Sequence, residues 1–263
     1  MHSHVDAHCH VDLLNDWQNA VNRLESREQF TLAVTTTPKA WRVEQEFARH
    51  CRYVRIGVGL HPQVLHERMD ELPLLERAIG ESRFVGEIGL DGSLMYRAGF
   101  PDQVKALRRI FSVCAEVKWR VLSLHSVRAV GPLLDLLEET NAHEGNALIF
   151  HWFTGSATEL ARALSMGAMI SVNADMLRTA KGRSHALAAG PERTLTESDA
   201  PFTRMHPMVD GIPSVDPAIR ALADCWGVSV LVTANSVEQL ARQYWQPSCI
   251  RSNCAELAHA KDA

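Results

Sequence analysis

The sequence predicts a single (β/α)8 barrel. Short runs of β-branched and other apolar residues alternate with longer helix-period stretches along almost the whole chain. Continuous apolar runs between helices are typical of parallel strands that are buried on both faces. Eight such units in 263 residues fit a barrel, which usually needs about 250 residues. A doubly wound open sheet is the structural alternative.

The predicted strands share a short length and an apolar interior, and span residues 5–9, 30–36, 53–59, 83–88, 120–124, 146–150, 169–172 and 194–197. Amphipathic stretches cover residues 41–50, 103–117, 130–139, 158–165, 216–226 and 236–244. Three segments with Gly and Pro each follow a strand and are expected to be long βα loops: 57–62, 90–101 and 201–217. We therefore expect one domain over residues 1–246 and a flexible tail, frayed or forming an added helix, over 247–263.

Composition excludes several classes of protein. With 46% hydrophobic and 22% charged residues, the chain can bury a large core. No apolar run approaches the roughly 20 residues of a membrane helix, and no signal peptide is visible, so no membrane partner is expected. The formal charge of −4 argues against a broad basic surface around a nucleic-acid duplex. Six scattered cysteines without CxxC spacing are typical of a reducing, cytoplasmic location.

The first predicted strand ends in a histidine motif, D-A-H-C-H-V-D at residues 6–12. Residues i and i+2 of a strand point to the same face, so His8 and His10 project together. Two imidazoles on one face suit a divalent cation, although two neighbouring histidines can also be a surface accident. Cys9 points to the opposite face and is best interpreted as a small buried hydrophobe.

Other predicted strands end in similar side chains. The fourth carries Glu87 among apolar residues and glycines, where an unpaired carboxylate would be costly. The fifth and sixth end in His125 and His151, and Asp199 follows the eighth. Taken singly, each histidine could be a hydrogen-bonded core residue, and Asp199 a turn acid. Because the carboxyl ends of barrel strands converge on one mouth, together they predict a metal centre.

Four imidazoles and two carboxylates exceed the needs of one tetrahedral ion. They suit two ions that share one bridging carboxylate. Mixed nitrogen and oxygen ligation is compatible with Zn, Mn, Fe, Ni or Co, and with Mg if waters complete its shell. We therefore expect two divalent metal ions as cofactors, with Mg, Mn and Zn as the main candidates.

These strand ends, in this order, resemble the TatD family of metal-dependent deoxyribonucleases, which have (β/α)8 barrels of the amidohydrolase-like type. Beside the first histidine motif, the matching segments are G-V-G-L-H-P at 57–62, V-G-E-I-G-L-D at 85–91, L-S-L-H at 122–125, F-H-W-F-T-G-S at 150–156 and L-T-E-S-D-A-P at 195–201. The similarity covers roughly residues 5 to 245. Each segment is short, but the set is highly specific.

The resemblance implies a role for each matched side chain. The metal ligands it implies are His8, His10, Glu87, His125, His151 and Asp199. The two histidines of the first strand would bind one ion, and those of the fifth and sixth strands the other. Glu87 would bridge the ions and Asp199 would also activate water, so these two are the expected catalytic residues.

Substrate contacts are less well defined. His61 is a candidate to bind the phosphate, and Trp152, with Phe153, could stack a base; a backbone cap and packing on the rim are the alternatives. Family members usually carry an Arg two residues after the fifth-strand histidine, whereas here Arg128 stands three residues after it. The last loop usually contains Arg-Asn-x-Pro, where this chain has D-G-I-P-S-V-D-P at 210–217. Asp6, Asp12 and Asp91 could orient imidazoles, or be caps and turn residues.

The predicted function is divalent-metal-dependent hydrolysis of phosphodiester bonds in DNA. Because the chain lacks a long basic run, we expect it to act on ends or short single strands. Segments 34–38, 151–153 and 196–199 most resemble the TatD-like nuclease of the four-gene Qat anti-phage defence system, which implies a role in defence and Qat proteins as partners. The alternatives are a hydrolase of a small amide, ester or phosphoester, and a non-catalytic metal-bound subunit of a defence complex.

Overall fold

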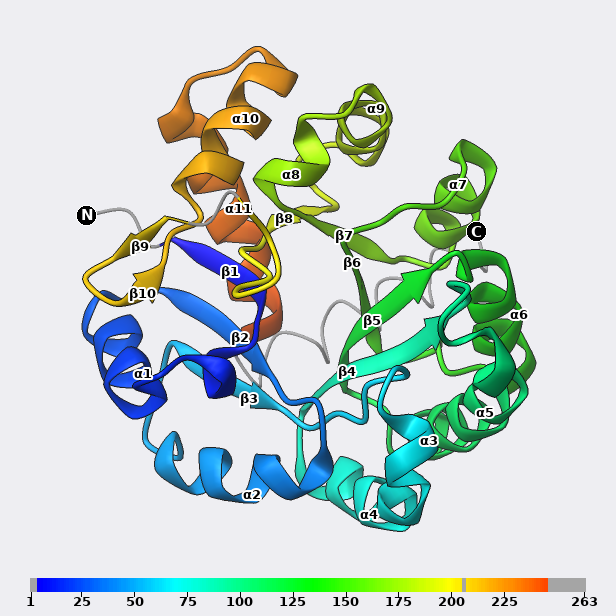
Figure 1. Cartoon of the computed structure of the whole chain (residues 1–263). Coiled ribbons are helices and arrows are strands. Elements are labelled where there is room, and N and C mark those ends of the chain that lie inside the picture. Colours follow the sequence, from blue (N-terminus) through cyan, green and yellow to red (C-terminus); the bar gives the residue numbers. More distant parts are fainter. Residues whose placement is uncertain (1–3, 205–206, 246–263) are drawn as a thin grey trace.

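A computed structural model describes residues 4–204 and 207–245 of the chain. In it, eight parallel strands form a ring that is surrounded by helices (Figure 1). The predicted tail over 247–263 lies outside the described residues. The ring confirms the predicted (β/α)8 barrel.

The strands of the ring are all short, and they are β1 (Val5–Cys9), β2 (Phe30–Val34), β3 (Val54–Gly57), β4 (Phe84–Asp91), β5 (Val121–Val127), β6 (Ala147–His151), β7 (Met169–Val172) and β8 (Thr194–Thr196). Parallel ladders pair neighbouring strands from β1 through β3 and from β4 through β8. A bridge between Val58 and Val85 connects these two sheets. Two backbone hydrogen bonds close the remaining seam. The amide of Asp199 donates to the carbonyl of His8, and the amide of His10 donates to Ala200, both at 2.9 Å.

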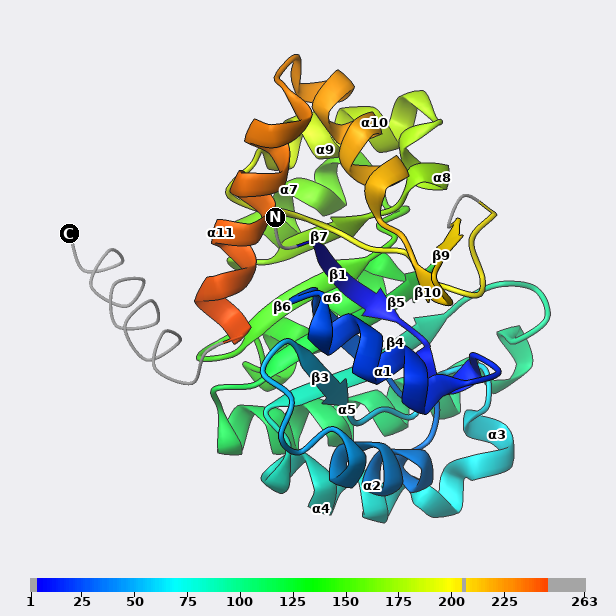
Figure 2. The ribbon, with the colours of Figure 1, turned by 90° about the vertical axis from the view of Figure 1, so that its left-hand side faces the viewer.

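Helices follow most strands and cover the outside of the ring. They are α1 (Trp17–Ser26), α2 (Pro38–Phe47), α3 (Leu65–Arg68), α4 (Leu72–Glu81), α5 (Phe100–Val117), α6 (Val130–Thr140), α7 (Ala157–Ser165), α8 (Ala174–Leu177), α9 (Ala180–Ala189), α10 (Asp216–Trp226) and α11 (Val230–Trp245). Short 3-10 turns occupy Val11–Leu13, Met69–Glu71 and Arg97–Gly99. A small hairpin of β9 (Met208–Val209) and β10 (Ile212–Pro213) lies beyond the carboxyl ends of the strands (Figure 2).

No single helix among the described residues is long and apolar enough to cross a membrane. The helices α10 and α11 reach that length and hydropathy only as a pair, and they are bent by 107° relative to each other.

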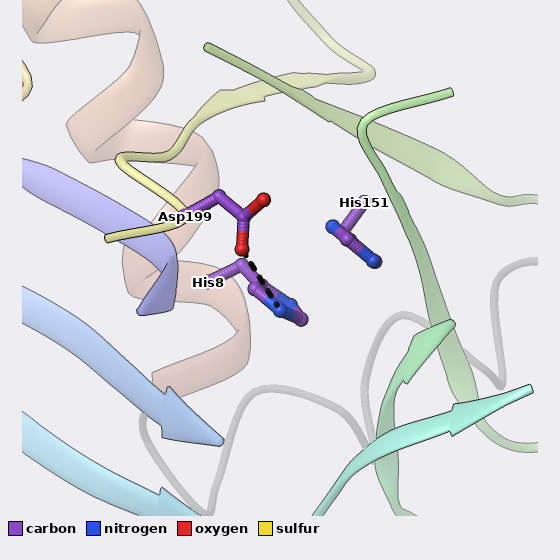
Figure 3. A group of neighbouring side chains, drawn as sticks. All are labelled: His8, His151 and Asp199. Atoms are coloured by element: carbon purple, nitrogen blue, oxygen red, sulfur yellow. Dashed lines mark ion pairs between the residues drawn. The ribbon is translucent and has the colours of Figure 1, made fainter. Parts of the chain in front are cut away.

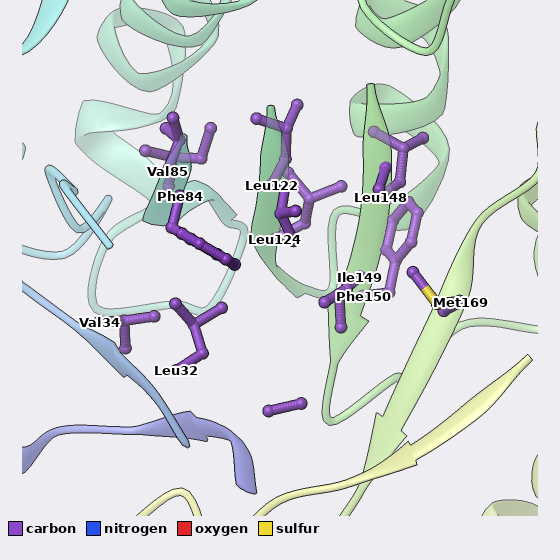
Figure 4. Close-up of a cluster of buried hydrophobic side chains, with 14 of the residues drawn as sticks. Leu32, Val34, Phe84, Val85, Leu122, Leu124, Leu148, Ile149, Phe150 and Met169 are labelled. Carbon is purple, nitrogen blue, oxygen red and sulfur yellow. The ribbon is translucent and has the colours of Figure 1, made fainter. Parts of the chain in front are cut away.

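Side chains alternate between two buried layers along each strand. On β5, Leu122 and Leu124 point outward and pack with apolar residues of neighbouring strands under the helices, among them Leu148 of β6 (Figure 4). Ser123 and His125, which alternate with these leucines, point into the barrel and are also buried. The interior of the ring therefore carries polar side chains, while the apolar core lies mainly between the ring and its helices.

Two strands continue further than the sequence predicts. β4 and β5 remain paired up to Asp91 and Val127, so His125 lies inside its strand and the first residues of the predicted loop 90–101 belong to β4. Helix α2 begins at Pro38, before the predicted start at residue 41, because proline suits the first turn of a helix. The periodicity of apolar residues alone does not reveal a helix that begins at a proline.

Candidate metal centre and active site

The predicted ligands meet at the carboxyl mouth of the barrel. They come from β1 and the residue after it, from β4, β5 and β6, and from the turn after β8, and all of them are buried: His8, His10, Glu87, His125, His151 and Asp199. The barrel thus brings together side chains that are up to 191 residues apart in the sequence, from residue 8 to residue 199.

Glu87 lies at the centre of the group, and its two carboxylate oxygens face different histidines. Its Oε2 lies 3.5 Å from Nε2 of His8 and 3.2 Å from Nε2 of His10. Its Oε1 lies 2.6 Å from Nδ1 of His125 and 2.8 Å from Nε2 of His151. The ring of His61 reaches this second oxygen as well, with Nε2 at 3.1 Å.

Two glycines allow the backbone around Glu87 to pack closely. A Cβ at Gly59 would lie 2.3 Å from the amide nitrogen of Glu87, so any larger residue there would push the β3 loop away from β4. Gly89 has φ +150°, and a Cβ there would lie 2.0 Å from the carbonyl oxygen of His125. Gly59 of the motif G-V-G-L-H-P and Gly89 of the motif V-G-E-I-G thereby allow β4 to lie in close contact with its neighbours.

Asp199 approaches the cluster from the turn after β8. Its Oδ1 lies 3.8 Å from Nε2 of both His8 and His10. Figure 3 shows Asp199, His8 and His151 grouped together inside the ring, with one imidazole above the other. The rings of His8 and His151 stack at 3.9 Å between centroids, with an interplanar angle of 11°.

Three overlapping sets of donor atoms are close enough to hold an ion, with all atoms of a set within 4.8 Å of one another. These sets are His8 with His151 and Asp199, His8 with His10 and Glu87, and His61 with Glu87 and His125. The sequence predicts His61 as a phosphate-binding residue, and the structure places it among the potential metal donors as well.

The electrostatics of the cluster fit a bound cation. Burial and the charge of Glu87 raise the pKa of Asp199 to about 8, so this carboxylate needs a nearby cation to stay ionised at neutral pH. Burial also raises the pKa of Glu87, but the neighbouring histidines, led by His61 and His151, outweigh it and hold this pKa well below its usual value. Burial and then the charge of His151 lower the pKa of His8, which favours the neutral imidazole that coordinates metals.

One buried nitrogen of His8 also indicates that the cluster binds a cation. Nε2 of His8 makes no hydrogen bond with any described residue, while Nδ1 of this ring lies 2.8 Å from Oγ of Ser123. A ring that is held by one nitrogen, while the other faces carboxylates without a hydrogen bond, is suited to bind a metal ion through that second nitrogen. Mixed nitrogen and oxygen donors around this atom fit a divalent cation.

Further polar residues orient the cluster. Oδ2 of Asp91 lies 3.2 Å from Nε2 of His125 and accepts a 2.7 Å hydrogen bond from the side chain of Gln63. Asp91 therefore positions an imidazole, one of the two roles considered for it. Asp6 instead accepts a 2.8 Å hydrogen bond from the amide of Ser198 and so joins β1 to the β8 turn. Asp12 lies in the 3-10 turn after β1.

Glu197 is a buried residue of the site that the sequence analysis did not assign. Its Oε1 accepts hydrogen bonds from the amide of Trp152 at 3.1 Å and from Nδ2 of Asn173 at 2.9 Å, and its Oε2 accepts one from Ser171. Trp152 has a left-handed φ of +39°, so this carboxyl holds the strained backbone directly after His151. Its spacing two residues before Asp199 is the same i, i+2 pattern that identifies the first histidine pair.

The cluster opens into a cavity of about 410 Å³. Its walls include His61, Gln63 and Trp152, and also Phe202, which the sequence analysis did not single out. Phe153, the second aromatic residue predicted beside the metals, is fully buried and does not line the cavity. Cavities of this size accommodate small molecules or parts of a larger substrate.

A buried histidine–carboxylate cluster at the carboxyl mouth of a (β/α)8 barrel defines the class of the protein as a metal-dependent hydrolase. Residues 5–246 match the model of the TatD-related DNase family, so the chain belongs to this family. The predicted family resemblance is therefore confirmed.

Individual relatives are distant but extensive. The chain is 28% identical over 257 residues to an uncharacterized metal-dependent hydrolase TatD of Mycobacterium tuberculosis, covering 88% of this chain and 96% of that protein. It is 26% identical over 196 residues to deoxyribonuclease Tat-D of Schizosaccharomyces pombe, covering 74% and 59%. The structure of a TatD homologue from Escherichia coli has a similar fold, with a TM-score of 0.76 and 21% identity over 90% of this chain and 95% of that one.

Proposed function

We propose that the chain is a two-metal deoxyribonuclease that hydrolyses phosphodiester bonds at DNA ends or in single strands. The observation that carries this proposal is the division of the histidines between the two oxygens of Glu87. A carboxylate that faces one donor set with each oxygen is suited to bridge two cations. Divalent ions bound there would polarise the phosphate and supply hydroxide at neutral pH. Mg, Mn and Zn are the candidate ions.

Under this proposal, the other residues hold the substrate and move the proton. Asp199 is the second carboxylate of the cluster and lines the cavity, which supports its role as the acceptor of the proton of the attacking water. His61 is more exposed than the imidazoles of the cluster, with 12% of its side chain accessible. It can donate a hydrogen bond to a phosphate oxygen. Trp152 offers an aromatic wall beside them.

The size of the cavity supports a strand end or a single strand as the substrate. A volume of about 410 Å³ can admit a nucleotide-sized group, whereas an intact duplex is far larger. DNA itself is the substrate class that membership of the family suggests. The formal charge of −4 agrees with an enzyme that binds a short stretch of strand.

Two narrower parts of the proposal depend on the sequence alone. The role in anti-phage defence, with Qat proteins as partners, rests on segments 34–38, 151–153 and 196–199. The cytoplasmic location rests on the scattered cysteines, and the four cysteines among the described residues are free.

Metal content measured together with nuclease activity tests the proposal. The purified full-length chain is loaded with Mg, Mn or Zn and offered labelled single strands, blunt duplexes and closed single-stranded circles. We expect about two ions per chain by elemental analysis and cleavage of the linear strands, with a loss of at least 100-fold in His8→Ala.

Other outcomes would favour the alternatives. Turnover of small amides, esters or phosphoesters without any DNA cleavage would replace the nuclease with a small-molecule hydrolase. Full biological activity of Asp199→Asn at unchanged metal content would indicate a non-catalytic subunit.

A further inference from the structure

We propose that Phe202 stacks on an unpaired base of the DNA, so that the enzyme selects strands whose base at this position is free. The inference rests on the proposed nuclease function and names a specificity-determining residue for it. Its basis is the position of the ring next to the cluster, its exposure and the rigidity of its backbone.

The backbone of Phe202 is fixed to the turn that carries Asp199. The amide of Phe202 donates a 2.8 Å hydrogen bond to the carbonyl of Asp199, and the hydroxyl of Thr203 donates one of 2.5 Å to Ser198. The ring lies edge-to-face with the imidazole of His10, with 5.1 Å between centroids and an angle of 87°. Phe202 is therefore an aromatic wall in direct contact with the cluster.

The exposure of this ring is unusual for its position. Phe202 is 60% exposed, and among the described residues that line the cavity it carries the only exposed large apolar side chain. Single exposed apolar residues are common on protein surfaces. Phe47 is one of them, since it is 37% exposed on the outer helix α2 and rests against Trp17. Phe202 differs because the uncovered ring is part of the substrate cavity.

The chemistry of a nucleobase matches this wall. A base presents a flat π-face whatever its identity, and stacking on an aromatic side chain is worth about 1–3 kcal/mol per base by alanine substitution. Trp152 supplies a second aromatic group in the same cavity, and its backbone is held by Glu197. Rings with few rotatable bonds on a fixed backbone lose little entropy when a ligand covers them.

A base inside a duplex cannot stack on a side chain, because its neighbours in the strand already cover both of its faces. Phe202 would therefore favour frayed ends and single strands over intact duplex, and its effect would disappear if the stacked base were missing. The dependence on the stacked base gives a direct test, since a base can be deleted from the substrate without changing the phosphates.

The experiment uses eight-nucleotide single strands, each with an abasic residue at one position, and compares wild type with Phe202→Ala, Phe202→Leu and Phe202→Tyr. We expect one abasic position to raise the KM of the wild type about tenfold with little change in kcat. Phe202→Ala and Phe202→Leu should show this increase on the intact strand and no further increase on that abasic strand. Phe202→Tyr should behave like the wild type.

Binding gives a second readout that does not depend on cleavage. A strand with 2-aminopurine at the sensitive position and phosphorothioate linkages that resist cleavage is titrated with the metal-loaded enzyme. Wild type and Phe202→Tyr should quench its fluorescence more than Phe202→Leu does. Leucine keeps apolar contact with His10 but has no π-face, so it separates stacking from a merely structural role. Phe47→Ala is the matched control on α2 and should leave KM and quenching unchanged.

The outcomes separate this inference from the proposed function. If the wild type cleaves the strands and Phe202→Ala is equally sensitive to the abasic position, the stacking inference is wrong and the nuclease stands. If no strand is cleaved and 2-aminopurine is not quenched, both fail. A lower metal content in Phe202→Leu would show that the ring supports His10 instead of a base.

Discussion

The cluster and the rim of the cavity are built in different ways. The inner cluster consists of the predicted ligands His8, His10, Glu87, His125, His151 and Asp199, and every member lies in a strand or within three residues of one. We define the rim as His61, Trp152 and Phe202 of the cavity wall together with Arg128, which directly follows Val127 of that wall. These residues lie in the loops that follow β3, β5, β6 and β8. The cluster is buried throughout, whereas the rim is half-buried or exposed.

This difference separates the residues that carry out the chemistry, which lie on or next to the strands, from those that select the substrate, which lie in the loops. Strand backbones are locked by their ladders, so the backbone positions of donors on them are fixed. Side chains such as Ser123 and Asp91 then only orient the rings of His8 and His125. Loop residues need individual supports, such as the carboxyl of Glu197 behind Trp152. Changes in the inner cluster should therefore abolish metal binding and activity together, and changes in the rim should alter affinity or positioning.

The largest effect is expected for Glu87→Gln. The amide retains one oxygen and replaces the other with a nitrogen that cannot ligate a cation, so one of the two histidine sets loses its carboxylate oxygen. Because metal ions contribute several kcal/mol to the transition state, we expect a loss of about 1000-fold in kcat. Elemental analysis should show that at least one ion per chain is lost.

Glu71→Gln is the matched control for this change. Glu71 is also a buried carboxylate, but it pairs with Lys39 and Arg68 outside the cavity. Its substitution should lower the melting temperature and leave metal content unchanged. Equal loss of metal in both variants would contradict the special role of the inner cluster.

The inner cluster could be anticipated from the sequence because its signals are local. Each side chain stands at the end of an apolar run, and the convergence of parallel strands supplies the rest. Glu197 carried the same kind of signal, two residues before Asp199, but its partners Ser171 and Asn173 lie on another strand and in a following turn. Whether Glu197 binds a metal ion or supports the backbone of Trp152 therefore depends on contacts with distant segments, which no local sequence pattern contains.

Other features were not visible in the sequence for physical reasons. Helix α9, A-K-G-R-S-H-A-L-A-A, is built from small and polar residues without an apolar stripe, so periodicity does not predict it. The extra pairs at the ends of β4 and β5 arise from contact between two strands. The exposure of Phe202 depends on how the turn after Asp199 folds, which the motif D-A-P does not specify.

A smaller effect is expected for Glu197→Ala. The change leaves the amide of Trp152 and the side chains of Ser171 and Asn173 without their acceptor in a buried site. Loss of such supporting partners typically costs 10- to 100-fold in activity, and we expect a loss of that size together with a lower melting temperature. Glu197→Gln retains an acceptor and should restore most of the activity. If the glutamine variant were as inactive as the alanine variant, positioning of Trp152 would not explain the defect.

The smallest effect is expected for Arg128→Ala. Arg128 directly follows Val127 of the cavity wall, has a left-handed φ of +51°, is exposed and forms no ion pair with another described residue. A free guanidinium there can contact a phosphate of the bound strand, so its removal should raise KM several-fold at unchanged kcat. The slope of log affinity against log salt should fall by about 0.7, the value for one phosphate contact on a single strand. Arg109→Ala removes a cation that is paired with Glu76 on the outer helices and should change neither quantity. An unchanged salt slope in Arg128→Ala would exclude this arginine from the rim that binds the substrate.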